Sequence, residues 1–151
     1  MRRILFAALA AGLLLATIMP SRAVDSSRGA IFRVIATADS TEVHPEALFD
    51  VTLSLQNLTG TVQRIQVPYC GWDRLWRSSN RRVEWDAFDC GDDTVSTVEI
   101  PPHGTYVFPK ALGMYVDESF SGPSIDFRMG FKTSMLGKTL WSQPISVEVV
   151  P

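Results

Sequence analysis

Residues 49–56 read Phe-Asp-Val-Thr-Leu-Ser-Leu-Gln, so that an apolar residue alternates strictly with a polar one. Successive side chains of a β-strand point to opposite faces, and this period of two predicts a half-buried strand. The residues expected to face the core are Phe49, Val51, Leu53 and Leu55. The residues expected to face outward or toward an edge are Thr52, Ser54 and Gln56. A register shift of one residue would turn the whole apolar set to water, so we expect this register to be fixed.

Other segments of strand character follow on both sides, and turn signals separate them. The expected strands are residues 31–37, 62–67, 83–88, 95–100, 105–108, 125–131 and 140–150. Residues 111–120 are ambiguous, and Pro144 indicates a bulge or an edge position because proline cannot donate to a ladder. No helical apolar stripe follows residue 24. The pattern predicts an all-β fold, an antiparallel immunoglobulin-like β-sandwich of about seven to eight strands.

Residues 48–108 contain a long alternating strand that ends in Gln-Asn-Leu-Thr, a return strand, and Pro-Pro-His-Gly before another strand. Together with the closing residues 141–149, this arrangement resembles secreted immunoglobulin-like β-sandwich modules of bacteria. The resemblance implies the fold and covers most of the chain. Antibody-type domains differ, because their two cysteines lie farther apart and join opposing sheets.

Asn57-Leu58-Thr59-Gly60 also partly resembles the first of three loops through which small β-sandwich proteins inhibit cysteine proteases. The glycine-rich second loop and the Arg-Pro-Trp third loop of those inhibitors are missing. Proteinase inhibition is therefore kept as an alternative function by fold analogy. The same residues form an acceptor sequence for N-glycosylation in a host that glycosylates.

The N-terminus has the layout of a secretory signal peptide. Arg2 and Arg3 precede an apolar run, and small residues at the −3 and −1 positions predict cleavage after Ala23. The alternative is a transmembrane anchor, but spanning a bilayer takes about 20 apolar residues and this run is shorter. We therefore expect a signal peptide at residues 1–23 and one β-sandwich domain at residues 24–151. The expected location is periplasmic or secreted, with no stable membrane span after cleavage.

Cleavage would also change the charge of the chain. The full sequence has 14 basic and 16 acidic residues, and three of the basic residues lie before position 24. The mature chain would thus carry 11 basic against 16 acidic residues, a net charge of −5. Nucleic-acid binding depends on neutralising phosphates, so we do not expect this acidic chain to bind nucleic acid.

The two cysteines, Cys70 and Cys90, fit an oxidising compartment. We expect a disulfide between them, which would stabilise the fold by about 3 kcal/mol in the loop-entropy view. Free thiols are the alternative. A zinc site is less favoured, because two cysteines fall short of the four ligands of a structural site.

The sequence offers little catalytic chemistry. Its two histidines, His44 and His103, each lie in a proline-containing turn, and no nucleophile elbow, zinc-binding helix motif or phosphate loop is present. Asp89, Asp92 and Asp93 could offer oxygen ligands to Ca²⁺, but a solvated acidic turn is the simpler interpretation. We expect a protein that is not an enzyme and has no cofactor or metal.

The segment from Cys70 to Cys90 is the best candidate for a binding surface, because it concentrates aromatic and basic residues and lacks strand periodicity before Val83. The candidate binding residues are Tyr69, Trp72, Arg74, Trp76, Arg77, Arg81 and Arg82. The alternative is structural, with the tryptophans covering the core and the arginines paired with nearby carboxylates. The expected function is a non-catalytic binding module for a protein or an acidic envelope component; a structural cell-envelope or matrix subunit is a further alternative.

Overall fold

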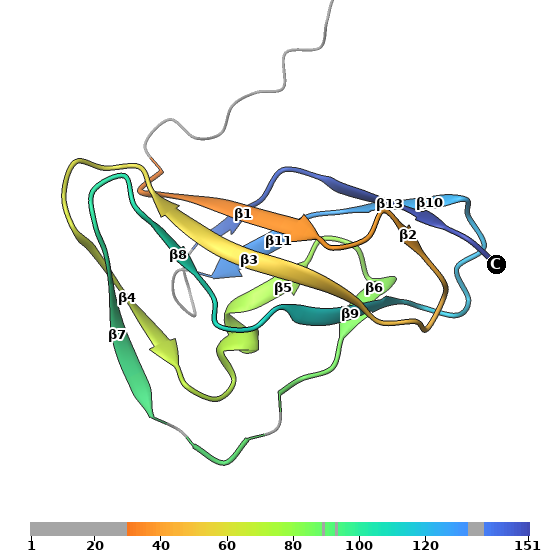
Figure 1. Cartoon of the computed structure of the whole chain (residues 1–151), viewed down its shortest axis with the longest axis horizontal. Helices are drawn as coiled ribbons and strands as arrows, with labels where there is room; N and C mark the ends of the chain where they lie inside the picture. Colours follow the sequence, from red (N-terminus) through yellow and green to blue (C-terminus); the bar gives the residue numbers. More distant parts are fainter. Residues whose placement is uncertain (1–29, 89, 93, 133–137) are drawn as a thin grey trace, which may run out of the picture.

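A computed structural model describes residues 30–88, 90–92, 94–132 and 138–151. This part of the chain is all-β, with thirteen strands and one 3₁₀ turn (Figure 1). Every strand pair is antiparallel except one, in which β2 lies parallel to β13. The expected signal peptide and the cleavage position before Val24 lie outside the described residues.

The strand predicted from residues 49–56 is the central strand of the largest sheet, whose order is β1-β3-β9-β6, with β8 also paired to β3. The strands are β1 (Phe32–Ala38), β3 (Phe49–Asn57), β6 (Val83–Trp85), β8 (Thr105–Val107) and β9 (Leu112–Val116). The predicted inner residues of β3 are all buried, and Thr52 is exposed. Ser54 departs from the prediction, because it is buried although it lies on the outer face. The register explains this difference: Ser54 lies between Ile35 of β1 and Val107 of β8.

Two three-stranded sheets form the opposite layer, in the orders β12-β11-β5 and β10-β13-β2. Their strands are β2 (Glu42–Val43), β5 (Trp76–Ser78), β10 (Ser124–Phe127), β11 (Met129–Lys132), β12 (Thr139–Trp141) and β13 (Ile145–Val149). β2 lies between the expected strands 31–37 and 49–56, in a segment for which the sequence predicts no strand. The single strand expected at residues 125–131 is instead two strands, because the chain changes partners at Arg128.

A β-bulge separates β12 from β13. Gly130 is opposite Trp141, whereas Phe127 is opposite Ile145, so residues 139–149 contain one extra residue relative to their partner strand. At this point the N–H of Met129 donates to the hydroxyl of Ser142 at 3.0 Å instead of to a carbonyl. Of the two positions expected for Pro144, a bulge or an edge, the register shows the bulge.

A two-stranded ribbon, β4 (Gln63–Pro68) with β7 (Val95–Ile100), extends at one end of the molecule, away from β2, β10 and β13 (Figure 1). Its inner side chains, Ile65, Val67 and Ile100, join the core. The disulfide between Cys70 and Cys90 is confirmed, with the Cα atoms 5.5 Å apart. It closes the excursion of the chain between β4 and β7.

The part of the bridged segment before Val83 is not the aperiodic loop that the sequence indicates. After the 3₁₀ turn η1 (Trp72–Leu75), the bridged segment supplies β5 to one layer and β6 to the other. β5 has three residues, too few for the period of two to be recognised, and β6 lies within the strand expected at residues 83–88. The segment therefore joins the two layers.

Candidate functional site

The tryptophans of the bridged segment belong to the core. Trp72 is 4% and Trp76 1% exposed. The ring of Trp72 lies 5.2 Å from the rings of Phe88 and Phe108, and the ring of Trp76 lies 5.1 Å from that of Phe108. Burial leaves neither tryptophan available to a partner. Both therefore cover the core, which is the structural alternative, and neither is a binding residue.

The four arginines of the same segment are exposed and point to different surroundings. Arg82 forms an ion pair with Asp117 at 3.2 Å, not with a carboxylate of its own segment. Arg81 is exposed in the turn before β6, and Arg74 lies in η1 beside Gly71. Tyr69 is 70% exposed next to the disulfide. The predicted binding residues therefore do not form one surface.

Arg77 has the most distinctive contacts of these residues. Its guanidinium carbon lies 5.1 Å from the centre of the Trp141 ring, and the guanidinium donates to the hydroxyl of Thr139. Arg77, Gly130 and Trp141 lie in one row across β5, β11 and β12. Because Gly130 has no side chain, the indole occupies the space above its Cα: a Cβ there would lie 2.7 Å from the ring. The guanidinium is thus held by the Trp141 ring and the Thr139 hydroxyl, and Gly130 leaves the space that the ring occupies.

Lys132 lies on the same face, two residues from Gly130, and its Nζ donates to the carbonyl of Arg74 at 3.4 Å. None of the described residues of β5, β11 and β12 is acidic. We call this surface the cationic face, formed by Arg74, Arg77, Lys132, Thr139 and Trp141. In a chain with more acidic than basic residues, this face is a local concentration of positive charge.

Lys132, Thr139 and Trp141 were not among the residues predicted for the site. Their only sequence signal is that Thr139 and Trp141 flank Leu140, which places both on the face opposite to Leu140 if the segment is a strand. Their proximity to Arg77 depends on the pairing of β11 with both β5 and β12, which no local pattern specifies.

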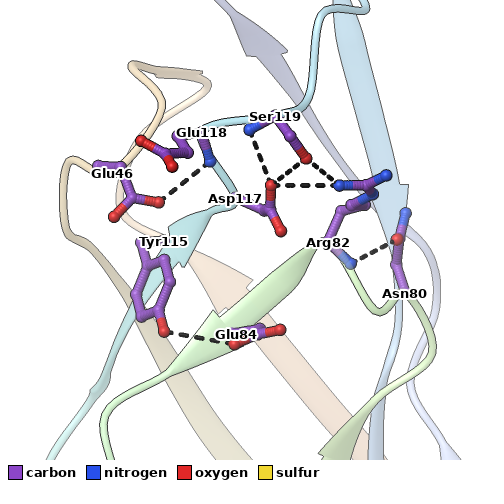
Figure 2. Close-up of polar contacts among 8 residues, drawn as sticks. All are labelled: Glu46, Asn80, Arg82, Glu84, Tyr115, Asp117, Glu118 and Ser119. Atoms are coloured by element: carbon purple, nitrogen blue, oxygen red, sulfur yellow. Dashed lines mark hydrogen bonds and ion pairs between the residues drawn. The ribbon is translucent and has the colours of Figure 1, made fainter.

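A second polar region is a cleft of about 480 Å³ beside β6 and β9, lined by Glu46, Glu84, Tyr115, Asp117, Glu118 and Ser119 (Figure 2). The hydroxyl of Tyr115 donates to Glu84 at 3.4 Å, and Glu46 accepts the backbone N–H of Glu118 at 3.1 Å. Asp117 accepts the N–H of Ser119 at 2.8 Å and also its hydroxyl.

These contacts shift the pKa values of two cleft residues, Asp117 and Tyr115. The hydroxyl and the N–H of Ser119 lower the pKa of Asp117, and the charge of Arg82 adds to this effect. Partial desolvation and then the negative charge of Glu84 raise the pKa of Tyr115. Asp117 is therefore ionised and Tyr115 protonated at neutral pH. A general acid needs a raised carboxyl pKa, so the lowered pKa makes Asp117 poorly suited to that role.

The Asn57-Leu58-Thr59 sequence has a structural role. The side-chain nitrogen of Asn57 donates to the carbonyls of Thr61 at 2.7 Å, Ile100 at 3.1 Å and Pro101 at 2.9 Å. Its oxygen accepts the N–H of Thr59 at 2.9 Å. Asn57 is fully buried, which makes its amide inaccessible to glycosylation in the folded chain and argues against an exposed inhibitory loop.

The remaining polar candidates lie in turns. His44 and His103 are exposed, as predicted. Asp92 accepts the N–H of Thr94 at 2.9 Å, and the hydroxyl and N–H of Thr94 lower its pKa. Asp89 and Asp93 lie outside the described residues. Among the residues that the structure describes, no group of histidine, cysteine and acidic side chains is arranged to hold a metal ion.

The sequence matches no protein-family model and no curated protein. In the described ranges of the chain, no helix could serve as a membrane span. A proposal for the function therefore rests on the geometry of the molecule, and the cationic face supplies that geometry.

Proposed function

We propose that the protein is an exported, non-catalytic binding module with an immunoglobulin-like β-sandwich fold, and that its cationic face binds a partner rich in carboxylates. The observation that carries the proposal is the Arg77 guanidinium held 5.1 Å from the centre of the Trp141 ring, on a face without acidic side chains.

Arginine suits this role because its planar fork of donors matches the two oxygens of a carboxylate. A free arginine side chain loses rotamer freedom when it binds, which reduces affinity. The contacts of Arg77 with Trp141 and Thr139 restrict the side chain before any partner arrives. Lys132 and Arg74 add positive charge beside it, which favours encounter with an acidic partner.

Export is supported by the signal-peptide layout of residues 1–23 and by the disulfide, which is stable in oxidising compartments. The fold proposal is supported by the two layers of mainly antiparallel strands around one core. The disulfide fixes both ends of the segment that carries Arg74 and Arg77.

The test uses immobilised poly-L-glutamate as a defined acidic probe and the mature, oxidised chain. We expect binding that weakens with added salt, because exposed charges are screened. Arg77→Ala should reduce affinity about tenfold, the equivalent of about 1.4 kcal/mol. Arg77→Lys should retain part of it, since lysine keeps the charge but lacks the fork.

The matched control is Arg64→Ala, which removes an exposed arginine that pairs with Glu99 at 2.7 Å on the β4–β7 ribbon. This variant should bind the probe as the wild type does. Equal losses for Arg64→Ala and Arg77→Ala would show that only net charge matters, and the proposed role of the cationic face would then be wrong.

A further inference from the structure

The β4–β7 ribbon carries a strand edge that the described part of the chain leaves unpaired. β7 pairs with β4 and with no other described strand. In the antiparallel register the N–H of Tyr69 donates to the carbonyl of Thr94 at 2.7 Å, which makes this a hydrogen-bonded pair. Such pairs alternate with non-hydrogen-bonded pairs along an antiparallel ladder. The backbone groups of Val95, Thr97 and Glu99 therefore point away from β4.

The two edges of the ribbon differ. The outward positions of β4 are Arg64, Gln66 and Pro68, the partners of the outward positions of β7. Proline has no N–H, so the β4 edge is blunted in the way that natural edge strands often are. The β7 edge has no proline, glycine or lysine, and its first three residues are exposed. A six-residue edge of this kind is a template for another strand.

Cross-strand side chains hold the ribbon in an extended shape. Arg64 pairs with Glu99 at 2.7 Å, and Gln66 donates to the hydroxyl of Thr97 at 2.9 Å. Both contacts join non-hydrogen-bonded pairs, where side chains of neighbouring strands lie closest. The edge is therefore ordered before a partner adds to it.

We propose that β7 pairs with β7 of a second copy of this chain, in a two-fold antiparallel arrangement centred on Thr97. This register places Val95 opposite Glu99 of the other copy and Thr97 opposite its own equivalent. All outward N–H and C=O groups of β7 then find partners, and the two ribbons form one four-stranded sheet. No like charges face each other, and threonine pairs are favourable across strands.

This inference is independent of the proposed function, because β7 contributes no residue to the cationic face. The contact is small, so we expect a weak, concentration-dependent dimer. An extended segment of another protein could add to the same edge. The second copy is favoured because this register brings two threonines together and places each Glu99 opposite an uncharged Val95.

The experiment compares the mature, oxidised chain from roughly micromolar to millimolar concentration, a range in which weak association shifts by mass action. Sedimentation should show a monomer–dimer equilibrium. Backbone hydrogen exchange should slow with concentration at Val95, Thr97 and Glu99. Exchange at Ser96 and Val98, which face β4, should not change.

Thr97→Lys would place two lysines opposite each other at the two-fold axis and should weaken dimerisation at least tenfold. Thr97→Val should preserve the dimer. Gln66→Lys is the matched control on the neighbouring strand β4. In the proposed dimer the two lysines would lie three strand spacings apart, about 14 Å. This separation exceeds the Debye length of about 10 Å at 0.1 M salt, so their repulsion is screened. This control should also preserve the dimer, and circular dichroism checks that each variant folds.

A chain that remains monomeric throughout this range would overturn the proposal and leave the edge to a strand from another protein. A dimer in which Val95, Thr97 and Glu99 exchange as fast as in the monomer would overturn it as well, because association would then use another surface.

Discussion

β3 and the bridged segment both contribute to the core, but they are held in place by different interactions. β3 has nine residues and is hydrogen-bonded to β1 on one side and to β8 and β9 on the other. The bridged segment contributes two three-residue strands, one to each layer, and depends on buried aromatic rings and a disulfide. Backbone pairing dominates the first region, and side-chain packing dominates the second.

The comparison predicts that the largest loss of stability follows from removing a ring of the bridged segment. Trp76→Ala should lower the free energy of unfolding by about 3–5 kcal/mol, as for large buried aromatics. Trp76→Phe should cost less, because it keeps a ring and removes an indole N–H that has no hydrogen-bond partner among the described residues. Urea unfolding measures both variants. A smaller loss for Trp76→Ala than for Trp76→Phe would contradict the packing role.

In β3 the loss of stability caused by a substitution should depend on the face of the strand on which the side chain lies. Leu53 is fully buried, and Leu53→Ala should cost about 2–5 kcal/mol. Ser54→Ala should change stability by less than about 0.5 kcal/mol, because Ser54 lies on the outer face and its small side chain leaves little cavity. Chemical denaturation of the two variants checks this prediction. Equal losses would mean that Ser54 is part of the packed interior.

The same difference explains what could be predicted from the sequence. The inner face of β3 was predicted residue by residue, because a long half-buried strand repeats its pattern several times. β5 was missed, because three residues cannot establish a period, whereas β6 lies within the strand predicted at residues 83–88 but ends at Trp85. The disulfide followed from the compartment and the cysteine count. Trp72 and Trp76 were placed in a binding surface because composition alone does not distinguish an exposed aromatic from a buried one.

The cationic face also depends on information that is not local. Arg77 was predicted as a binding residue, but its partners come from β11 and β12, more than fifty residues later in the chain. Only the pairing of the strands brings Trp141 to Arg77. Conversely, Arg82 pairs with Asp117, because the turn after β9 lies beside the start of β6 (Figure 2).

Gly130 of β11 lies between Arg77 of β5 and Trp141 of β12. A substitution at Gly130 tests whether the outer face of this sheet depends on packing, as the inner face does. A Cβ at this position would lie 2.5 Å from Cγ2 of Thr139 and 2.7 Å from the Trp141 ring. Gly130→Ala should therefore cost about 1–3 kcal/mol, the usual range for overpacking, and should displace Trp141 from Arg77. Thermal unfolding and binding to poly-L-glutamate measure the two effects.

The control for this change is Gly113→Ala in β9. A Cβ at Gly113 would have its nearest neighbour at 3.7 Å, an ordinary contact, so this variant should be nearly neutral. If both glycines tolerate alanine equally, Trp141 is free to move and Arg77 is not held by a fixed ring.

The smallest expected effect concerns the turn between β5 and β6 in the bridged segment, where Arg82 forms an ion pair with Asp117. Hydrogen bonds from Ser119 and then the charge of Arg82 lower the pKa of Asp117 in the folded chain. A carboxyl group with a depressed folded pKa contributes stability above its unfolded pKa of about 3.9, and this contribution is lost as pH falls through the folded pKa. The wild type should therefore be slightly more stable than Asp117→Asn at neutral pH, and the difference should disappear in acid.

Ser119→Ala, which removes the largest cause of the shift, should reproduce most of this pH dependence. Urea unfolding between neutral pH and about pH 2 makes the comparison. A difference that persists unchanged in acid would show that Asp117 acts through its shape in the turn and not through its charge.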